Sequence, residues 1–219
     1  MNKGGIDLLP KMDMLNKLSN AKIVAVIRGD DDKEALAISE AALKGGFSAI
    51  EVTYTTPGAE KVIEALANDN EVLVGAGTVL DAETARHALL HGAKFVVSPH
   101  FSAEISEVCN RYSIPYFPGC LTIKEMIDAL EHGCDVMKLF PANNLQPSFM
   151  KAVNGPLPHV RMMPTGGINI DNFMDWLDMG AFAVGVGSDL TKAYRANGAS
   201  AVTEQCEKYI NILNGKEEK

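Results

Sequence analysis

Short apolar runs rich in β-branched residues recur along the chain, and amphipathic polar segments separate them. Each run has the length of a strand and usually ends in glycine, threonine, serine or proline before a helix-start signal. Between the runs, segments such as 32–44 and 82–90 have helical periodicity, and several end at glycine. We therefore predict eight strands, at residues 23–28, 49–52, 72–76, 95–98, 116–119, 135–140, 161–165 and 183–187.

Alternation of such strands with helices is typical of a parallel sheet that is covered by helices. Eight units predict an α/β fold of the closed (β/α)8 type, a compact TIM barrel with short helices and loops. The alternative is an open doubly wound sheet, but no G-x-G-x-x-G sequence follows the first strand. The segment up to Ser19 predicts a short extra helix at the N-terminus.

Composition narrows the class of protein. The 219 residues suffice for one large core and are few for two ordinary domains, so we expect a single domain over residues 1–219. No apolar stretch approaches the ~20 residues of a membrane helix, and the first residues do not resemble a signal peptide. The net charge of -8 argues against nucleic-acid or anionic-membrane partners. The cysteines form no C-x-x-C pair, and we expect a cytoplasmic protein with reduced thiols.

A single lysine interrupts the sixth predicted strand, in the sequence VMKLFP. Because strand side chains alternate, Val136, Lys138 and Phe140 share one face, which points either into the barrel or towards the helices. Both surroundings are apolar, and an ammonium group there loses hydration, which favours the neutral amine that attacks carbonyl carbons. Lys138 is therefore a candidate Schiff-base lysine. The alternative is a lysine that extends to the barrel mouth and binds a phosphate or a carboxylate.

Glu51 lies near the end of the second predicted strand, again as a charged residue in an apolar run. A carboxylate that faces a lysine across a barrel interior can transfer the protons that Schiff-base chemistry requires. The structural alternative is an ion-pair partner for Arg28 or Lys138, and the two roles are compatible. Thr78, after the third strand, supplies a hydroxyl donor, and Pro99, after the fourth, forms a stiff turn that can shape an apolar wall.

Glycines follow both the seventh and the eighth predicted strands, in the sequences PTGGI and VGVGS. Glycine loops at these two positions of a barrel, opening onto helix N-termini, form a common phosphate site. We name Gly166, Gly167, Gly187 and Ser188 as the expected donors. The alternative is a pair of tight turns without a ligand.

The histidines do not form a metal-binding pattern. His87 and His91 lie four residues apart, but the sequence HALLH lacks the glutamate of H-E-x-x-H and belongs to a peripheral helix. His100 follows the fourth strand and is a candidate lining residue. We expect no metal and no other cofactor.

Taken in order, VAVIR, IEVTY, GAGTV, VVSPH, YFPG, KLFPA, PTGGI and VGVGS resemble the motifs of one enzyme family. It is the family of 2-keto-3-deoxy-6-phosphogluconate (KDPG) and 4-hydroxy-2-oxoglutarate (KHG) aldolases, and the resemblance covers roughly residues 15–213. It implies a (β/α)8 barrel, a homotrimer and metal-free class I aldol chemistry on a phosphorylated 2-keto acid. KDPG would be cleaved reversibly to pyruvate and glyceraldehyde 3-phosphate, and KHG to pyruvate and glyoxylate.

The resemblance also assigns roles to residues. Lys138 matches the Schiff-base lysine, and Glu51 matches the general acid and base. Residues that match substrate contacts, phosphate contacts or the pocket wall are Arg28, Thr78, Pro99, Phe140, Thr165, Gly166, Gly167 and Ser188.

One position departs from the family pattern. Many members carry an arginine four residues after the glutamate, in contact with the substrate carboxylate, where this chain has Thr55. Threonine cannot make the bidentate contact of an arginine. We therefore expect Arg28, with the hydroxyls of Thr78 and Thr55, to hold the carboxylate. A pocket shifted towards another 2-keto acid is the alternative.

Two other functions stay open from the sequence. A phosphate-binding epimerase or isomerase on the same barrel would use the glycine loops but not Lys138, and its common metal-dependent form needs a ligand set that the sequence lacks. A catalytically silent binding barrel would leave Lys138 and Glu51 in unfavourable positions without a role. Nor does the sequence separate KDPG from its galactonate epimer, since the two differ only in the placement of a hydroxyl.

Overall fold

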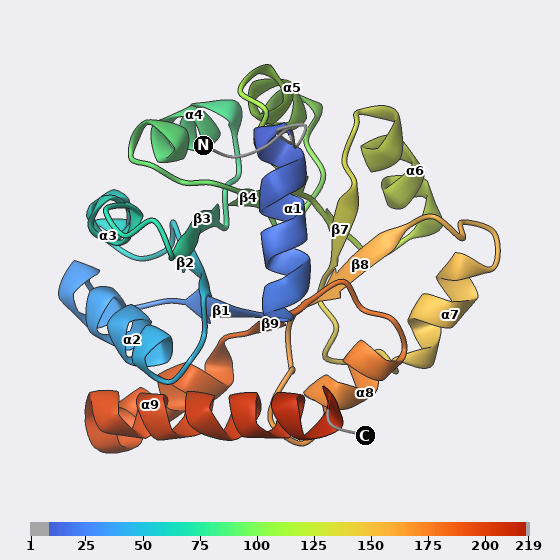
Figure 1. Cartoon of the computed structure of the whole chain (residues 1–219). Coiled ribbons are helices and arrows are strands. Elements are labelled where there is room, and N and C mark those ends of the chain that lie inside the picture. The colour runs from blue at the N-terminus through green and yellow to red at the C-terminus, as the bar shows by residue number, and fades with distance from the viewer. Residues whose placement is uncertain (1–8, 218–219) are drawn as a thin grey trace, which may run out of the picture.

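The computed structural model describes residues 9–217, in which strands and helices alternate (Figure 1). The predicted N-terminal helix is confirmed as α1 (Pro10–Ala21), while residues 1–8 and 218–219 of the expected domain lie outside the described part. The strands are β1 (Ile23–Ile27), β2 (Ala49–Thr53), β3 (Leu73–Gly77), β4 (Val96–Val97), β5 (Tyr116–Phe117), β6 (Gly119–Cys120), β7 (Val136–Leu139), β8 (Arg161–Pro164) and β9 (Val184–Val186). The other helices are α2 (Asp32–Lys44), α3 (Ala59–Ala67), α4 (Ala82–Leu90), α5 (Ala103–Arg111), α6 (Ile123–Glu131), α7 (Ser148–Asn154), α8 (Phe173–Asp178) and α9 (Ser188–Glu217).

The described strands pair in parallel and form two sheets. Six strands make a curled half-barrel in the order β5-β4-β3-β2-β1-β9, and three make a second sheet, β6-β7-β8. The predicted strand at 116–119 is divided because Pro118 has no N–H group to donate, although its carbonyl accepts a 2.8 Å hydrogen bond from the backbone of Lys138. A single bridge between Thr165 and Gly185 connects the end of β8 to β9. The parallel α/β architecture is as predicted, with the strands arranged as a curled half-barrel and a second sheet that this bridge joins.

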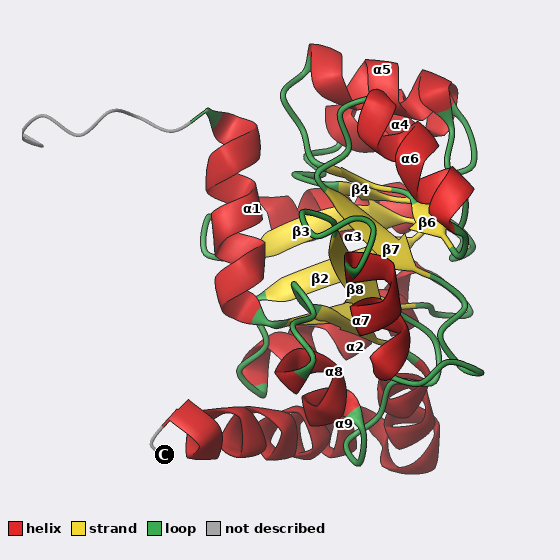
Figure 2. Cartoon of the chain, turned by 90° about the vertical axis from the view of Figure 1, so that its right-hand side faces the viewer, coloured by secondary structure: helices red, strands yellow, loops and turns green. Residues whose placement is uncertain are grey.

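Alternate residues of each strand face two different apolar layers. One layer lies between the strands and the surrounding helices and includes Ala25 and Ile27 of β1. The other is enclosed by the strands, where Val24 packs in one cluster with Leu15 and Leu18 of α1. Figures 1 and 2 show α1 lying across the strands at the end where β1 begins. This helix therefore closes the amino end of the interior.

Polar contacts attach α1 to the strand that carries Lys138. The Nζ atom of Lys11 lies 2.7 Å from the carboxylate of Asp135 and donates a 2.8 Å hydrogen bond to the carbonyl of Gly133. Both acceptors come just before β7 in the chain. The helix that closes the interior is thus fixed to one of the strands that form it.

Side-chain caps set the starts of helices in the outer layer. Asp81 and Thr122, residue types that favour helix starts, accept hydrogen bonds from the backbone N–H groups of Thr84 and Glu125. The Glu125 carboxylate in turn accepts from the backbone N–H groups of Leu121 and Thr122, which completes a capping box on α6. These bonds, the one from Leu121 most of all, hold the pKa of the Glu125 carboxyl below its usual value.

The last helix consists of two segments. Its backbone leaves the helical region at Asn197 and Gly198, and Gly198 has a φ of 74°. The first segment begins at Ser188, directly after β9, and the second runs beside α2 (Figure 1), where Cys206 lies against Gly45. Neither α9 nor any other described helix combines the length and the apolar character that crossing a membrane requires.

Candidate active site

Lys138 and Glu51 meet in the interior that the strands enclose. Lys138 lies on β7 and Glu51 on β2, and the Nζ atom is 3.3 Å from Oε1. Only 6% of the lysine side chain and 0% of the glutamate side chain are exposed. The ion pair that the sequence allowed between these residues is therefore present, and it is a buried one.

The Glu51 carboxylate keeps one oxygen without a partner. Oε1 contacts Lys138, whereas the buried Oε2 has no hydrogen-bond partner within the described residues. Leaving a buried carboxylate oxygen unpaired is unfavourable, so a polar group that enters beside Lys138 gains a strong acceptor. Gly77 of β3 makes room for the carboxylate, since a Cβ atom at this position would overlap Oε1 and Cγ of Glu51.

Two residues predicted to form the pocket wall lie near Lys138. Phe140 is close to the lysine itself, and Pro99 packs against the strand that pairs with it. The Nζ atom of Lys138 is 5.2 Å from the centroid of the Phe140 ring, a distance typical of a cation–π contact. Gly119 of β6 pairs in register with Lys138, and a Cβ atom at Gly119 would overlap the backbone of Pro99. The half-buried Thr78 follows Gly77 with a φ of 55°, which is unusual for a β-branched residue.

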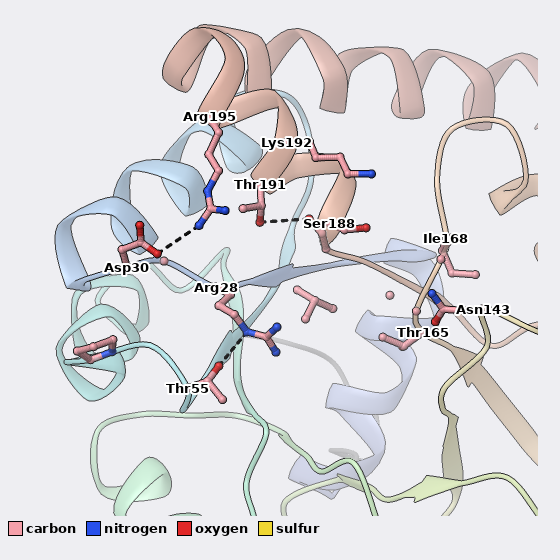
Figure 3. A pocket seen from close by; sticks show the side chains of 17 residues that line it. Arg28, Asp30, Thr55, Asn143, Thr165, Ile168, Ser188, Thr191, Lys192 and Arg195 are labelled. Carbon is pink, nitrogen blue, oxygen red and sulfur yellow. Dashed lines mark hydrogen bonds and ion pairs between the residues drawn. The ribbon is translucent and has the colours of Figure 1, made fainter.

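A cavity of about 770 Å³ opens at the carboxyl ends of β1, β8 and β9 and at the start of α9 (Figure 3). In barrel enzymes the carboxyl ends of the strands carry the active site. The predicted residues that line the cavity are Arg28, Thr55, Thr165, Gly166, Gly167, Gly187 and Ser188. The predicted residues that do not line it are Glu51, Thr78, Pro99, Lys138 and Phe140.

The buried pair lies on the strands next to those that form the cavity. Val26, which lines the cavity, is the register partner of Glu51 on the neighbouring strand. Thr165, also in the lining, comes two residues after Met163, the register partner of Lys138. The cavity and the pair are therefore neighbouring parts of one site, with the pair at the more deeply buried end.

The glycine loop after β8 forms one side of the cavity. Gly166 and Gly167 have φ values of 98° and 75°, which favour glycine over any other residue. Added Cβ atoms would crowd Asn143, which follows β7 and also lines the cavity. Within the described residues, no loop or turn hydrogen bond is found for the backbone N–H group of Gly167. This group is therefore available to an anion, as the first N–H groups of α9 are.

The first segment of α9 supplies two cations that the sequence analysis missed. Lys192 and Arg195 line the cavity, four and seven residues after Ser188, a spacing that places all three on one helix face. Arg195 lies 3.2 Å from the carboxylate of Asp30, whereas Lys192 has no ion pair within the described residues. Figure 3 shows the side chains of Lys192 and Ser188 pointing in the same direction, away from Arg195. The helical spacing after VGVGS was the signal that predicts these two cations.

Arg28 and Thr55, the residues connected with the family departure, contact each other. The Nε atom of Arg28 donates a 2.9 Å hydrogen bond to the Thr55 hydroxyl (Figure 3). Both side chains are exposed to the cavity rather than buried. Thr55, which follows β2, thus contacts an arginine that follows the neighbouring strand β1.

The histidines and cysteines of the described chain, which could also take part in catalysis, do not line the cavity. Residues 9–217 contain no group of three or more histidine, cysteine or acidic side chains that could hold a metal ion. His87 accepts or donates a 3.0 Å hydrogen bond with the Tyr54 hydroxyl, and neither His87 nor His100 lines the cavity. Burial raises the thiol pKa to about 12 at Cys109, Cys120 and Cys206, and to about 11 at Cys134. These thiols are protonated at neutral pH and are not nucleophiles.

Known proteins are similar to this chain along most of its length. The model of the family described as KDPG and KHG aldolase matches residues 14–205. A 2-dehydro-3-deoxy-6-phosphogalactonate aldolase from Escherichia coli (strain K12) is 34% identical over 174 residues, 78% of this chain and 85% of the relative. A 2-dehydro-3-deoxy-phosphogluconate aldolase from Treponema pallidum (strain Nichols) is 36% identical over 162 residues, 73% of this chain and 77% of the relative.

A solved structure agrees with these relatives. KDPG aldolase from Legionella pneumophila, with pyruvate captured at low pH as a covalent carbinolamine intermediate, superposes with a TM-score of 0.78 at 31% identity. The superposition covers 89% of this chain and 96% of that one. Both the family model and the relatives cover most of the sequence, and this chain therefore belongs to the KDPG and KHG aldolase family.

Proposed function

We propose that this protein is a class I aldolase that cleaves KDPG reversibly to pyruvate and glyceraldehyde 3-phosphate, and KHG to pyruvate and glyoxylate. The observation that carries the proposal is the buried Lys138–Glu51 pair with its unpartnered Oε2 atom, next to a cavity lined by cations. An amine and a carboxylate at this distance are the two groups that Schiff-base catalysis needs. An epimerase or isomerase without a covalent intermediate has no use for the lysine.

The first half of the reaction forms the iminium. Glu51 takes a proton from the Lys138 ammonium through the Nζ–Oε1 contact, which leaves a neutral amine. The amine attacks C2 of the keto acid, and the proton that the newly bonded nitrogen loses is transferred to the oxyanion, which becomes the carbinolamine hydroxyl. Glu51 then protonates this hydroxyl, which leaves as water, and the nitrogen lone pair completes the C=N bond.

The second half breaks the carbon–carbon bond. Glu51, through a water molecule, removes the proton of the C4 hydroxyl, and the C3–C4 electron pair moves towards the cationic nitrogen. Glyceraldehyde 3-phosphate leaves with a new carbonyl at C4. The remaining enamine takes a proton at C3, and water hydrolyses the iminium to release pyruvate and to restore Lys138.

The cavity supplies the binding groups. The glycine loop at Gly166 and Gly167, with Gly187, Ser188 and Lys192, is suited to the phosphate by hydrogen bonding and charge. We assign substrate contacts beyond the phosphate to Arg28, Thr78 and Thr165, and the walls of the pocket to Thr55, Pro99 and Phe140. In this assignment the phosphate lies at the open end and the keto group at the buried end.

The proposal extends to the architecture. We infer a closed (β/α)8 barrel in a single domain, supported by the Thr165–Gly185 bridge and by the Pro118 carbonyl that accepts from Lys138.

We also infer a cytoplasmic homotrimer. Exposed apolar side chains at Leu80, Leu121, Ile123 and Ile127 suit a contact between subunits, and the free cysteines suit a reducing compartment. Light scattering after size-exclusion chromatography measures the subunit number.

The test is to trap the iminium. The protein is incubated with pyruvate, reduced with borohydride and mapped by peptide mass spectrometry, with Lys138→Met and a reaction without borohydride as controls. We expect the mass of one reduced pyruvyl group on the peptide that contains VMKLFP, and no such mass in either control. An adduct on a different lysine, or equal labelling of Lys138→Met, would refute the assignment. A cleavage panel of KDPG, its galactonate epimer and KHG then ranks the substrates.

A further inference from the structure

A chain of hydroxyl groups runs from the cavity into the protein between β1 and β2. The Nε atom of Arg28 lies 2.9 Å from the Thr55 hydroxyl, which lies 3.0 Å from the Thr53 hydroxyl. The Thr53 hydroxyl lies 2.9 Å from the backbone carbonyl of Ile27. Ile27 immediately precedes Arg28, so the chain of hydroxyl groups ends on the peptide group that joins these two residues.

The direction of every bond in this chain is fixed by chemistry. A carbonyl only accepts, so the single proton of the Thr53 hydroxyl goes to Ile27. Thr53 must then accept from the Thr55 hydroxyl, and Thr55 accepts from the guanidinium of Arg28. Each hydroxyl therefore donates once and accepts once, and Thr55 has no proton left for a substrate oxygen.

The inner end of the chain is firmly held, whereas the outer end is not. Thr53 is 1% exposed and lies on β2, two residues after Glu51 on the same strand face. Arg28 is exposed, and it forms no ion pair within the described residues, because the nearby Asp30 pairs with Arg195. Without the hydroxyl chain, a long exposed arginine would sample many rotamers and would lose that freedom on binding.

We propose that Thr53 and Thr55 are positioning residues that hold Arg28 ready to bind an anionic group of the substrate. The bond from Nε fixes the plane of the guanidinium and leaves its two terminal nitrogens for a bidentate contact with a carboxylate or a phosphate. This inference rests on the proposed aldolase function and deepens it. Thr55, the position of the expected departure from the family pattern, thus positions the arginine that follows the neighbouring strand.

The experiment compares KM and kcat for KDPG and KHG in variants of the three residues. Thr55→Val keeps the shape of the side chain and removes the hydroxyl, so we expect KM to rise about fivefold to tenfold, which corresponds to the net value of one ordinary hydrogen bond. Thr55→Ser should return KM towards the wild-type value. Thr53→Val should also raise KM, although Thr53 does not line the cavity. In all these variants we expect kcat to stay within about twofold, because the reacting atoms are untouched.

The decisive measurement is a double-mutant cycle with Arg28→Gln. If the threonines act through the arginine, Thr55→Val raises KM no further in the Arg28→Gln protein. An equal rise in both backgrounds would overturn the proposal, as would wild-type KM values in Thr55→Val.

Comparing the two substrates identifies the anion that Arg28 binds. A rise in KM for KDPG alone identifies the anion as the phosphate, and a rise for both substrates identifies it as the carboxylate. A wild-type protein that cleaves neither substrate and traps no pyruvate refutes the proposed function instead, and thermal unfolding checks that each variant is folded.

Discussion

Lys138 pairs with a carboxylate that is 0% exposed, whereas Arg195, at the other end of the site, pairs with Asp30 while 62% and 84% of their side chains are exposed. The first pair is surrounded by strands and has an unpartnered oxygen. The second lies at a cavity whose other cations, Arg28 and Lys192, form no ion pair with described residues. The same types of group are thus held in two different environments within one site.

The environments suit different tasks. In the buried end, charges interact strongly and are not screened by salt, so small displacements change the reaction barrier. In the open end, charges are hydrated and screened, so each contributes modestly to binding. We therefore expect changes at the buried end to act on kcat and changes at the open end to act on KM.

The largest expected effect is at Lys138. Lys138→Met removes the nucleophile, so we expect turnover of KDPG to fall by about 10⁴-fold or more. The variant also leaves the Glu51 charge buried without its partner, which should lower the free energy of unfolding by about 3–5 kcal/mol. Lys138→Met/Glu51→Gln should recover part of that stability but no turnover. Substantial KDPG cleavage by Lys138→Met would remove the distinction between the two ends.

Glu51→Gln tests the other half of the buried pair. The amide keeps the shape of the side chain but cannot carry protons, so we expect kcat at saturating KDPG to fall by about 10²–10⁴-fold. KM should change far less, because Glu51 does not line the cavity. A wild-type kcat in Glu51→Gln would make the residue structural only.

Two substitutions compare cations within the open end. Lys192→Gln should raise KM for KDPG about tenfold, because an unpaired charge near the glycine loop is lost. Arg195→Gln removes the same charge from the same cavity, but this arginine is already paired with Asp30, so we expect about a twofold change. KHG, which has no phosphate, should show neither effect. Equal effects of the two variants on KDPG would mean that only the net charge of the cavity matters.

The smallest effect lies outside both ends and is on stability. Glu125→Gln weakens the capping box of α6 and should lower the free energy of unfolding by about 0.5–1 kcal/mol at pH 7. The folded-state pKa of Glu125 is lowered, so its stabilisation is present above the unfolded pKa of about 4.3 and is lost as pH falls through the folded pKa. Urea unfolding at pH 7 and pH 3 should show this difference shrinking on acidification. A difference that grows at low pH, or an altered kcat, would contradict this.

The sequence predicted the fold and the buried pair more fully than the cavity. Continuous apolar strands and helix caps such as Asp81 and Thr122 are local signals, so the alternation of elements was visible. Period two placed Val136 and Lys138 on one strand face, but whether that face pointed inwards depends on tertiary packing. A proline inside the fifth run was the sign that this strand is divided.

Side-chain contacts between residues far apart in the sequence could not be predicted from it. The unpartnered Oε2 of Glu51 depends on what surrounds it, and no local pattern encodes an empty acceptor. In the sequence, Thr55 only marked the absence of the expected arginine. The structure shows that its hydroxyl accepts a hydrogen bond from Arg28, 27 residues away. Lys192 and Arg195 were predictable in part, since helical spacing places them beside Ser188, but the pairing of Arg195 with Asp30 was not.

The position of α1 decides the route by which molecules reach and leave the site. Because Leu15 and Leu18 seal the interior at the amino ends of the strands, molecules enter and leave the site through the carboxyl end only. In the proposed reaction, pyruvate stays covalently bound to Lys138 as the enamine until the aldehyde has left, so the aldehyde is released first. In the synthetic direction the order reverses, with pyruvate loading first and the aldehyde second. The protein should therefore follow an ordered sequence of binding and release, in which both molecules pass through the end that α1 leaves open.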